Sequence, residues 1–238
     1  MENFTNNKEE LTNLNSFSSK ASEKIYQNYR LKGVEIKIIK KYFTEPGAKT
    51  LDIGCGYGRT TRPLFEMGLD VTGIDIVENM ITAAKADNPQ IEFKLMSAAK
   101  IEYPDNFFDY ILFSFNGIDF IYPKKRRIKA LQEINRVLKP GGTFIVSSHN
   151  KMRLFTKFNL HYIEIIFKNL VSGRLFSNYL KARHEEGELI TYFSPPFCQK
   201  RDFKKAGFQI LEIMGKKYNN ELLINLFEGW PYYALKKQ

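Results

Sequence analysis

The run LDIGCGYGRT at residues 51–60 constrains the fold of this chain more than any other part of its sequence. The apolar residues at its start predict a short strand. Gly54, Gly56 and Gly58 then let the backbone turn sharply with no side chain obstructing a ligand above it. A strand that passes through a glycine turn into a helix is the first unit of a dinucleotide-type α/β fold. The nicotinamide fingerprint G-x-G-x-x-G is excluded, because a run that starts at Gly54 would need glycine where Arg59 stands.

Two acidic residues near this turn indicate what kind of ligand it holds. Asp52 comes immediately before the turn, where a carboxylate suits the amine of a ligand that has no phosphates. Thr60 and Thr61 are predicted to cap the helix that follows the turn. The run VTGIDI at 71–76 predicts the next strand, and Asp75 at its end lies about twenty residues beyond the turn, where a carboxylate accepts both hydroxyls of a ribose.

Two further runs complete a set of four ordered motifs. The run NFFDYILFSF at 106–115 predicts a buried strand, and EINRVLKPGGTFIVSS at 133–148 predicts the end of a helix, a Pro-Gly-Gly turn and another strand. With these motifs in this order, the chain resembles the class I S-adenosylmethionine-dependent methyltransferases, in particular the small single-domain enzymes that act mainly on small molecules. The resemblance is close over roughly residues 40–150 and looser beyond them.

Apolar strand patterns alternate with helical patterns along the chain, which indicates an α/β fold with a mainly parallel sheet and helices on both faces. Strands are predicted at residues 50–53, 71–74, 91–96, 108–113, 143–147, 209–213 and 232–235. Helices are predicted at residues 78–86, 124–138 and 201–206. The resemblance implies a Rossmann-like, seven-stranded sheet whose final strand is antiparallel to its neighbours.

A chain of 238 residues, 43% of them hydrophobic, is long enough for one domain with a substantial core. We expect it to be organised in four segments: a mobile segment and leading helix at 1–40, the cofactor-binding Rossmann-like core at 41–149, an insertion that covers the acceptor pocket at 150–198, and the C-terminal part of the same core at 199–238.

The first residues, 1–20, are rich in Asn, Ser, Thr and charge, and we expect them to stay mobile until a ligand binds. Residues 22–43 have the pattern of an amphipathic helix. The resemblance implies that this helix packs near the cofactor, with Tyr26, Tyr29 and Arg30 approaching its methionine carboxylate. A role in helix packing alone fits each of these three residues equally well.

The resemblance implies S-adenosylmethionine as the cofactor. The glycine turn then approaches the methionine portion, Asp52 holds its ammonium directly or through water, and Asp75 binds the ribose. Ile76 and Met80 pack against the adenine. The expected cofactor-binding residues are Asp52, Gly54, Cys55, Gly56, Gly58, Asp75, Ile76, Met80, Ser97, Ala98 and Phe113. We assign no metal site.

The chain departs from the family after the third predicted strand. Many relatives have Gly-Asp-Ala there, whereas this chain has Met96, Ser97 and Ala98. The carboxylate that would accept the exocyclic amine of adenine is therefore absent, and the Ser97 hydroxyl or a backbone carbonyl is the expected, weaker substitute. This departure leaves open a cofactor-binding protein that has lost catalysis.

Methyl transfer from a sulfonium depends chiefly on positioning, so a strong base is optional. His149 directly follows the fifth predicted strand and is the best-placed candidate for a catalytic general base, against the alternative of a surface-loop histidine. Phe113 at the end of the fourth strand can face the sulfonium with its π surface, although a buried Phe is more often part of a core.

The connection at 150–198 is unusually long, and long connections tend to carry structure or function. Its aromatic-rich, helix-like run at 155–170 is expected to cover the acceptor pocket, and such a wall suits a planar or apolar acceptor. The competing interpretation is that these rings pack the insertion onto the sheet. We expect transfer of the methyl group to oxygen or nitrogen of a small molecule.

A formal net charge of +10 raises RNA or DNA as the alternative partner. The densest basic run, KKRRIK at 124–129, opens a helix with a buried apolar stripe, so its charges are expected mainly on the solvated face. The sequence shows neither a recognisable nucleic-acid module nor the Asn-Pro-Pro-Tyr signature of enzymes that methylate amino groups of nucleic acids. A nucleic-acid methyltransferase or binding protein is therefore the less favoured interpretation.

Neither its apolar runs nor its cysteines suggest a membrane or secreted protein. No run approaches the roughly eighteen apolar residues that span a bilayer. Cys55 and Cys198 are too few for a disulfide framework. We therefore expect a cytoplasmic protein with no membrane partner.

Overall fold

The computed structural model describes residues 8–18, 31, 33–157, 159–184 and 187–238. The strands are β1 Lys49–Ile53, β2 Asp70–Asp75, β3 Glu92–Leu95, β4 Phe108–Phe113, β5 Leu138–Ser147, β6 Tyr179–His184, β7 Gly187–Tyr192, β8 Phe208–Met214 and β9 Tyr232–Lys237. The helices are α1 Lys8–Phe17, α3 Gly33–Tyr42, α4 Thr61–Glu66, α5 Glu78–Asp87, the 3-10 helix η1 Gly117–Phe120, α6 Lys124–Val137, α7 Met152–Thr156, α8 Leu160–Val171, α9 Pro196–Lys205 and α10 Glu221–Phe227.

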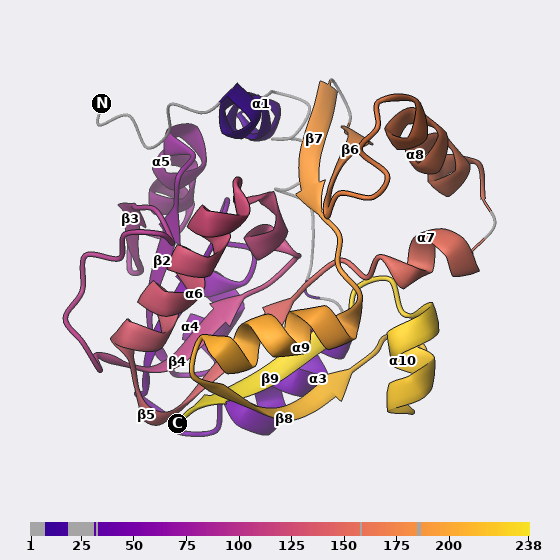
Figure 1. The fold of residues 1–238 in the computed structure, drawn as a ribbon. Coiled ribbons are helices and arrows are strands. Elements are labelled where there is room, and N and C mark those ends of the chain that lie inside the picture. The colour runs from indigo at the N-terminus through magenta and orange to yellow at the C-terminus, as the bar shows by residue number, and fades with distance from the viewer. Residues whose placement is uncertain (1–7, 19–30, 32, 158, 185–186) are drawn as a thin grey trace.

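The main sheet of the described chain has seven strands in the order β3-β2-β1-β4-β5-β9-β8 (Figure 1). Strands β1 to β5 are parallel, and β9 runs antiparallel to both β5 and β8. Both the seven-stranded, mainly parallel sheet and the antiparallel final strand predicted from the resemblance are confirmed. Because β1 lies between β2 and β4, the strand order reverses at β1, and ligands bind beside such a reversal in open α/β sheets.

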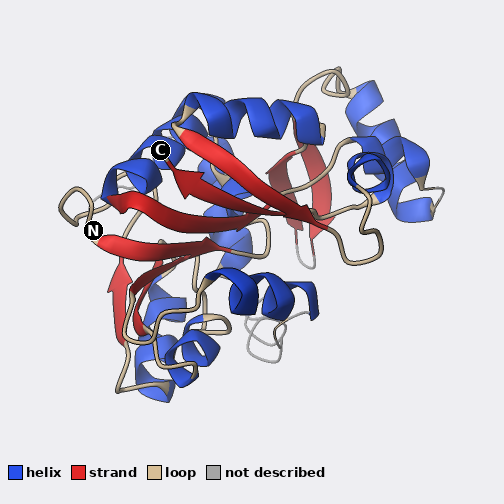
Figure 2. Cartoon of the chain, turned by 90° about the horizontal axis from the view of Figure 1, so that it is seen from below, coloured by secondary structure: helices blue, strands red, loops and turns tan. Residues whose placement is uncertain are grey.

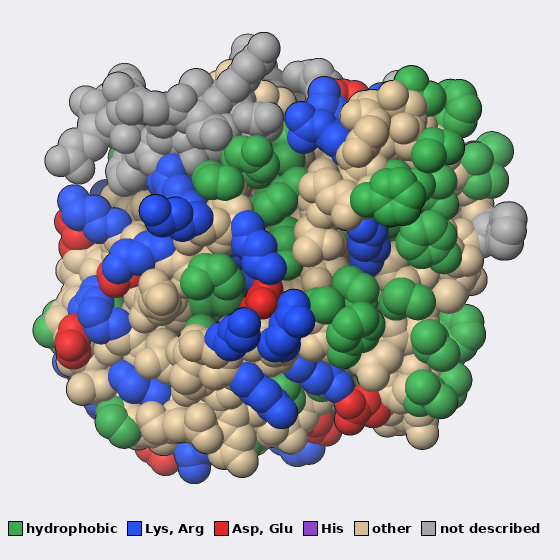
Figure 3. All heavy atoms as spheres, viewed as in Figure 1, with side chains coloured by type: hydrophobic (Ala, Val, Ile, Leu, Met, Phe, Trp, Pro, Cys, Tyr) green, Lys and Arg blue, Asp and Glu red, His purple; other side chains and the backbone are tan. Residues whose placement is uncertain are grey.

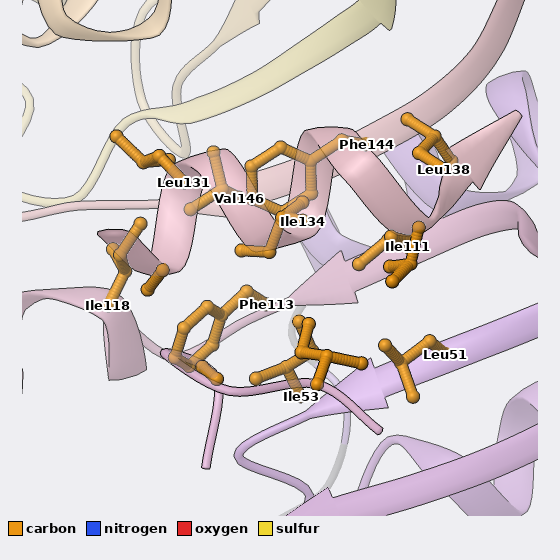
Figure 4. Close-up of a cluster of buried hydrophobic side chains, with 14 of the residues drawn as sticks. Leu51, Ile53, Ile111, Phe113, Ile118, Leu131, Ile134, Leu138, Phe144 and Val146 are labelled. Atoms are coloured by element: carbon orange, nitrogen blue, oxygen red, sulfur yellow. The ribbon is translucent and has the colours of Figure 1, made fainter. Parts of the chain in front are cut away.

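Helices cover both faces of the sheet (Figure 2). On one face, Leu131 and Ile134 of α6 and Phe203 of α9 pack against Ile111 and Phe144 of the sheet, all of them buried (Figure 4). On the other face, α3 and α4 pack against Val71, Leu112 and Ile145 among others. Burial on both sides explains why the central strands read as nearly continuous apolar runs.

Residues 8–17, within the segment expected to be mobile, form helix α1. Its Asn13 side chain is buried and donates to the carbonyls of Phe120 (3.0 Å) and Ile190 (2.9 Å), while its Oδ1 accepts from the Ile190 N–H (2.8 Å). Contacts with η1 and β7 thus order a helix that its polar composition does not predict. The predicted helix at 22–43 is found from Gly33 to Tyr42 as α3; Tyr26, Tyr29 and Arg30 lie outside the described residues.

The long connection is built differently from its prediction. The helical run is split into α7 and α8, and it is followed by an unpredicted antiparallel hairpin, β6–β7. Tyr179 of β6 donates from its hydroxyl to the Ile121 carbonyl at 2.8 Å, which ties the hairpin to the segment after η1. Helix α9 begins at Pro196, five residues earlier than the predicted start at 201. Among the described helices, none has both the length and the apolar character to cross a membrane.

Candidate active site

A pocket opens at the carboxyl edge of the sheet, where β1, β2, β3 and β4 end. It encloses about 1170 Å³ when the part open to solvent is included. Segments after all four strands line it, together with η1 and one side of α1. The lining includes these residues predicted from the sequence: Gly54, Cys55, Gly56, Asp75, Ile76, Met80, Ser97, Ala98 and Phe113. The structure therefore brings most of the predicted cofactor residues to one cavity.

The glycine turn is closed by a carboxylate from the neighbouring strand. The Gly56 N–H donates to Asp75 Oδ2 at 2.9 Å, and the Val77 N–H donates to Asp75 Oδ1 at 3.0 Å. Gly54 has a φ of +64°, and a Cβ there would lie 3.0 Å from the Phe113 ring. Both the backbone conformation and the close approach of the ring therefore require glycine at this position.

Asp75 keeps room for a ligand after these contacts. Burial raises the pKa of its carboxyl, and hydrogen bonds from the N–H groups of Gly56, Val77 and Ile76 oppose that rise. Of these three N–H groups, Gly56 and Val77 have hydrogen-bond geometry, one to each carboxylate oxygen, so each oxygen has a further lone pair. Two ligand hydroxyls can bind to those lone pairs.

The side of the pocket predicted to hold the adenine is apolar, and the polar groups expected there already make hydrogen bonds within the protein. Ile76, Met80 and Ala98 line it. The Ser97 hydroxyl accepts from the Ala99 N–H at 3.2 Å, and the Ser97 carbonyl accepts from the Lys100 N–H at 3.0 Å. The two expected substitutes for the missing carboxylate thus already serve the turn itself, which weakens both as acceptors.

Asp52 does not line the pocket but lies behind it. Its Oδ2 accepts from the hydroxyls of Thr60 and Thr61, both at 2.6 Å, and Thr60 is part of the pocket wall. The predicted capping of α4 is therefore wrong, because neither hydroxyl bonds to the helix start. Asp52 Oδ1 is buried without a hydrogen-bond partner, and burial raises the pKa of this carboxyl to about 6 against the threonine hydrogen bonds.

Gly58 is the other predicted turn residue that lies outside the pocket wall. Its φ is +82°, and a Cβ there would lie 3.3 Å from the Phe93 ring and 3.4 Å from the Asn88 amide. In the structure this glycine allows the turn to pack onto β3 and the end of α5. Its predicted contact with the cofactor is not supported by this position.

A buried ion pair supplies a cation to the pocket wall. The Arg59 guanidinium donates to both carboxylate oxygens of Glu35 on α3, at 2.9 and 2.8 Å, and the Ser114 hydroxyl donates to the same carboxylate. Arg59 also lies over the Phe115 ring, 5.0 Å from its centroid. Sequence reasoning missed this group because Arg59 stands inside the glycine motif while its partner is on another helix.

The segment after β4 adopts a strained conformation at the pocket. Phe115 and Asn116 have φ values of +54° and +60°, in the left-handed region that side chains other than glycine rarely adopt. Phe115 lines the pocket, and its ring lies 6.3 Å from that of Trp230, centroid to centroid. Strain of this kind is concentrated at functional sites, where the surrounding structure enforces it.

His149, the predicted general base, is held by a buried carboxylate but does not line the pocket. Its Nδ1 lies 3.0 Å from Asp119 Oδ2, and its backbone N–H donates to the same oxygen at 2.6 Å. Its ring packs against Phe120, which is part of the pocket wall, with a centroid distance of 5.9 Å. His149 therefore lies one ring behind the wall.

Arg127 is the buried member of the basic run at 124–129, and it lies near the charge of Asp119. Its side chain is fully buried, with Nη2 3.7 Å from Asp119 Oδ1 and Nη1 3.7 Å from Asp202 Oδ2. Nη2 also donates to the Gln199 side chain at 2.6 Å. One of the basic charges expected on the solvated face of this helix is therefore internal.

The aromatic-rich run does not cover the pocket as predicted. None of the described residues of α8 lines it, and the wall opposite the sheet is formed instead by Asn13, Leu14 and Phe17 of α1 with Phe120 and Ile121. Leu14 and Phe17 face the pocket because Asn13, next to them on the helix, is bonded to β7 and η1. The cover was missed because it depends on contacts between distant parts of the chain.

Comparison with known proteins gives consistent results. Residues 51–146 match a family described as "Methyltransferase domain". The demethylmenaquinone methyltransferase of Staphylococcus aureus is 30% identical over 217 residues, covering 86% of this chain and 83% of that enzyme. The enzyme of the same name from Renibacterium salmoninarum is 33% identical over 135 residues, which span 56% of this chain and 55% of that enzyme.

A solved structure shows the same fold at lower identity. The S-adenosylmethionine-dependent methyltransferase from Methanosarcina mazei superposes with a TM-score of 0.70 at 20% identity. The alignment covers 88% of this chain and 99% of that protein. The likeness extends beyond the matched motifs to the later strands of the sheet.

Proposed function

Because the chain belongs to the class I S-adenosylmethionine-dependent methyltransferases, we propose that it methylates a planar, apolar small molecule that carries a hydroxyl group. One observation carries the proposal: the cavity that begins at the glycine turn and Asp75 continues into the rings of Phe115 and Phe120. A polar cofactor site and an apolar acceptor site thus share one cavity. Sharing a cavity is the arrangement that direct transfer of a small group requires.

The described residues fit the cofactor. Asp75 offers two oxygens to the ribose hydroxyls, Met80 and Ile76 offer an apolar slot to the adenine, and the turn at Gly54 leaves space for the methionine portion. We propose that the unpartnered Oδ1 of Asp52 holds the ammonium through water, since Thr60 stands between this carboxylate and the cavity. When bound, S-adenosylmethionine supplies a methyl group on a sulfonium, ready for displacement by a nucleophile.

We propose that Asp119 and His149 remove a proton from the acceptor. The contact between Asp119 Oδ2 and His149 Nδ1 keeps the ring proton on Nδ1, which leaves Nε2 free to accept. Because the Phe120 ring lies between His149 and the pocket, Nε2 would take the hydroxyl proton of the acceptor through one intervening water, which would leave the acceptor ionised for methylation. Phe115, Phe120 and Trp230 surround this region, which suits a flat aromatic acceptor.

Demethylmenaquinone in its reduced form is the first acceptor to assay. The names of the two curated relatives specify it, and it is planar, apolar and hydroxylated. Transfer to oxygen or nitrogen stays a prediction, and demethylmenaquinone tests it, because its conversion to menaquinone would place the methyl group on a ring carbon instead. We do not propose a nucleic-acid acceptor, since Arg127 of the densest basic run is buried. A cytoplasmic location is part of the proposal, supported by the free Cys55 and Cys198 thiols.

Calorimetric titration with S-adenosylmethionine and with S-adenosylhomocysteine tests the cofactor site. We expect both to bind at one site, with competition between them. If neither binds the full-length chain, the proposed activity is wrong.

Replacing the proposed base, His149, tests the removal of a proton from the acceptor. We expect His149→Ala to lower kcat by roughly 10²- to 10⁴-fold with unchanged cofactor affinity, because the base acts only on the acceptor proton. The lost rate should return partly at high pH, where the acceptor ionises without help. His161→Ala, a change at an exposed histidine on α8, is the matched control. A His149→Ala enzyme with the parent kcat at neutral pH would show that positioning alone suffices.

A further inference from the structure

Helix α8 carries apolar residues on two opposite sides, one that packs on the protein and one that is exposed. On the inner side, Ile165 is buried against Leu154, Leu180 and Phe193. On the outer side, five large apolar residues are exposed: Leu160 at 86%, Ile163 at 50%, Phe167 at 65%, Leu170 at 54% and Val171 at 74%. Their spacing of three, four, three and one residues places them on a single face of the helix.

Exposed aromatic residues extend this face at both ends of α8. Phe155 of α7 precedes the helix and Phe176 follows it, and the latter is 91% exposed. Figure 3 shows hydrophobic side chains gathered on the right of the molecule, where Figure 1 places α7, α8 and α10. We call the outer side of α8 with Phe155 and Phe176 the α8 apolar face. Contiguous apolar surface of this kind marks an interaction site.

The charge around the α8 apolar face narrows the choice of partner. The segment 151–177 that carries it has five basic residues and one acidic residue: Lys151, Arg153, Lys157, Lys168 and Arg174 against Glu164. Glu188 of β7 lies 3.0 Å from Lys168, and counting it leaves an excess of three positive charges. A second copy would bring the same positive excess against itself, on a chain whose formal net charge is already +10. An apolar face flanked by basic residues is complementary to an anionic lipid surface.

We propose that the α8 apolar face binds the surface of an anionic lipid bilayer, with α8 lying in the plane of the interface. The sequence alone predicts no membrane partner, because the relevant helix is short and was expected to face inward. Lipid binding of this type needs no span: an amphipathic helix inserts its apolar side to the depth of the headgroup boundary.

The position of the α8 apolar face relative to the pocket suggests what lipid binding would do for the enzyme. This step rests on the proposed function. The inner side of α8 packs on β6, β6 pairs with β7, and β7 contacts α1, which forms one wall of the pocket. A bilayer beneath α8 would thus lie next to the elements that cover the acceptor site. An apolar acceptor dissolved in that bilayer would reach the pocket with little exposure to water.

Co-sedimentation of the full-length protein with vesicles tests the proposal without cofactor or acceptor, so its failure would leave the proposed function intact. We expect binding to phosphatidylcholine vesicles that contain phosphatidylglycerol, and much weaker binding to phosphatidylcholine alone. The variant Ile163→Ser/Phe167→Ser should lose about tenfold or more in partitioning, because it removes two large side chains from the inserted face. Thermal unfolding should match the parent, since both side chains are exposed.

The matched control is Phe65→Ser on α4, a partly exposed phenylalanine outside the α8 apolar face. It should bind vesicles like the parent. Equal vesicle binding by the double variant and the parent would overturn the proposal, as would no binding to anionic vesicles. Light scattering that finds a parent dimer and a variant monomer, without vesicle binding, would assign the face to self-association and also overturn it.

Discussion

The sheet edge that carries the glycine turn and the cover above it are held together by contacts of different range. At the edge, Gly56 donates to Asp75 nineteen residues further along, and Val77 donates to the same carboxylate from two residues away. In the cover, Asn13 bonds to residues 107 and 177 positions away. The edge is part of the buried sheet, whereas the cover is joined to it by the hydrogen bonds of Asn13 and by a small apolar cluster that includes Leu14 and Phe17.

The edge and the cover therefore have different roles in the proposed function. The groups proposed to bind the cofactor lie on strand ends that cannot move without disturbing the core, so we expect them to stay in position when no ligand is bound. Helix α1 and the β6–β7 hairpin contribute no residue to the main core cluster and pack in smaller clusters, so we expect them to move more easily than the strand ends. Changes at the edge should therefore alter stability and affinity, while changes in the cover should alter rates of exchange.

The largest expected effect concerns Asp52, and it tests whether the sheet edge holds a buried carboxyl group at a cost in stability. Its pKa is raised from 3.8 to about 6 in the folded state. The folded state therefore holds more protons than the unfolded state between about pH 4 and 6, and stability falls as pH rises through that window. Two pKa units correspond to about 3 kcal/mol.

Asp52→Asn removes this titration. We expect the difference in free energy of unfolding, variant minus parent, to grow by about 3 kcal/mol from pH 4 to pH 7. Urea titrations at several pH values measure it. If the stability of the two proteins changed in the same way with pH, the pKa of Asp52 in the folded state would not be raised.

Asp75 gives the next effect, on affinity. We expect Asp75→Ala to weaken S-adenosylmethionine binding by about 1.5 to 3 kcal/mol, the usual range for hydrogen bonds to a charged group. Calorimetry measures it, and Asp70→Ala at the exposed start of the same strand is the control. Unchanged affinity in Asp75→Ala would contradict the assigned contact with the ribose.

The edge was predictable from the sequence for the same reason that it is rigid. Strand β4 was predicted at its observed limits, and β2 and β3 within a residue at either end, because burial on both faces leaves apolar runs bounded by turns. Gly54 and Asp75 follow from the strand ends. Asp52 was expected to hold the ligand directly or through water, and the sequence does not reveal that two threonine hydroxyls bind this carboxylate.

The cover was not predictable because its order comes from distant contacts. Helix α1 has few apolar residues, and the strands of the hairpin, YLKARH and GELITY, mix charged with apolar residues. From sequence alone, both segments are as compatible with a loop as with a helix or a strand. The hydrogen bonds between Asn13 and Ile190 are what join these two elements in the structure. The outward face of α8 was missed for a related reason: an aromatic, helical run indicates burial, and the sequence does not say which side is buried.

A smaller effect is expected from loosening the cover. Asn13→Ala leaves the Ile190 N–H and two buried carbonyls without a partner, at a local cost of about 1 to 3 kcal/mol. We expect faster hydrogen exchange in α1 and several-fold faster cofactor release. Asn15→Ala, an exposed position on the same helix, is the control. Equal release rates in parent and Asn13→Ala would mean that α1 does not retain the cofactor.

The smallest effect concerns Phe115, where edge and cover meet. Its φ of +54° costs roughly 1 kcal/mol or more for a non-glycine residue, and Phe115→Gly removes that cost. The same change removes the ring that lies beside Arg59 and Trp230. Stability should therefore change by less than about 1 kcal/mol, because relief of strain offsets the lost packing.

Methyl transfer should respond differently from stability in this variant. If the Phe115 ring forms the acceptor wall, KM for an aromatic acceptor rises while cofactor affinity stays at the parent value, since Asp75 and the glycine turn are untouched. Asn116→Gly, with a φ of +60° at the next position, removes a left-handed side chain outside the pocket wall and should leave KM unchanged. If Phe115→Gly and Asn116→Gly had the same KM, the Phe115 ring would not contact the acceptor, and its backbone conformation would matter only for the fold of the turn.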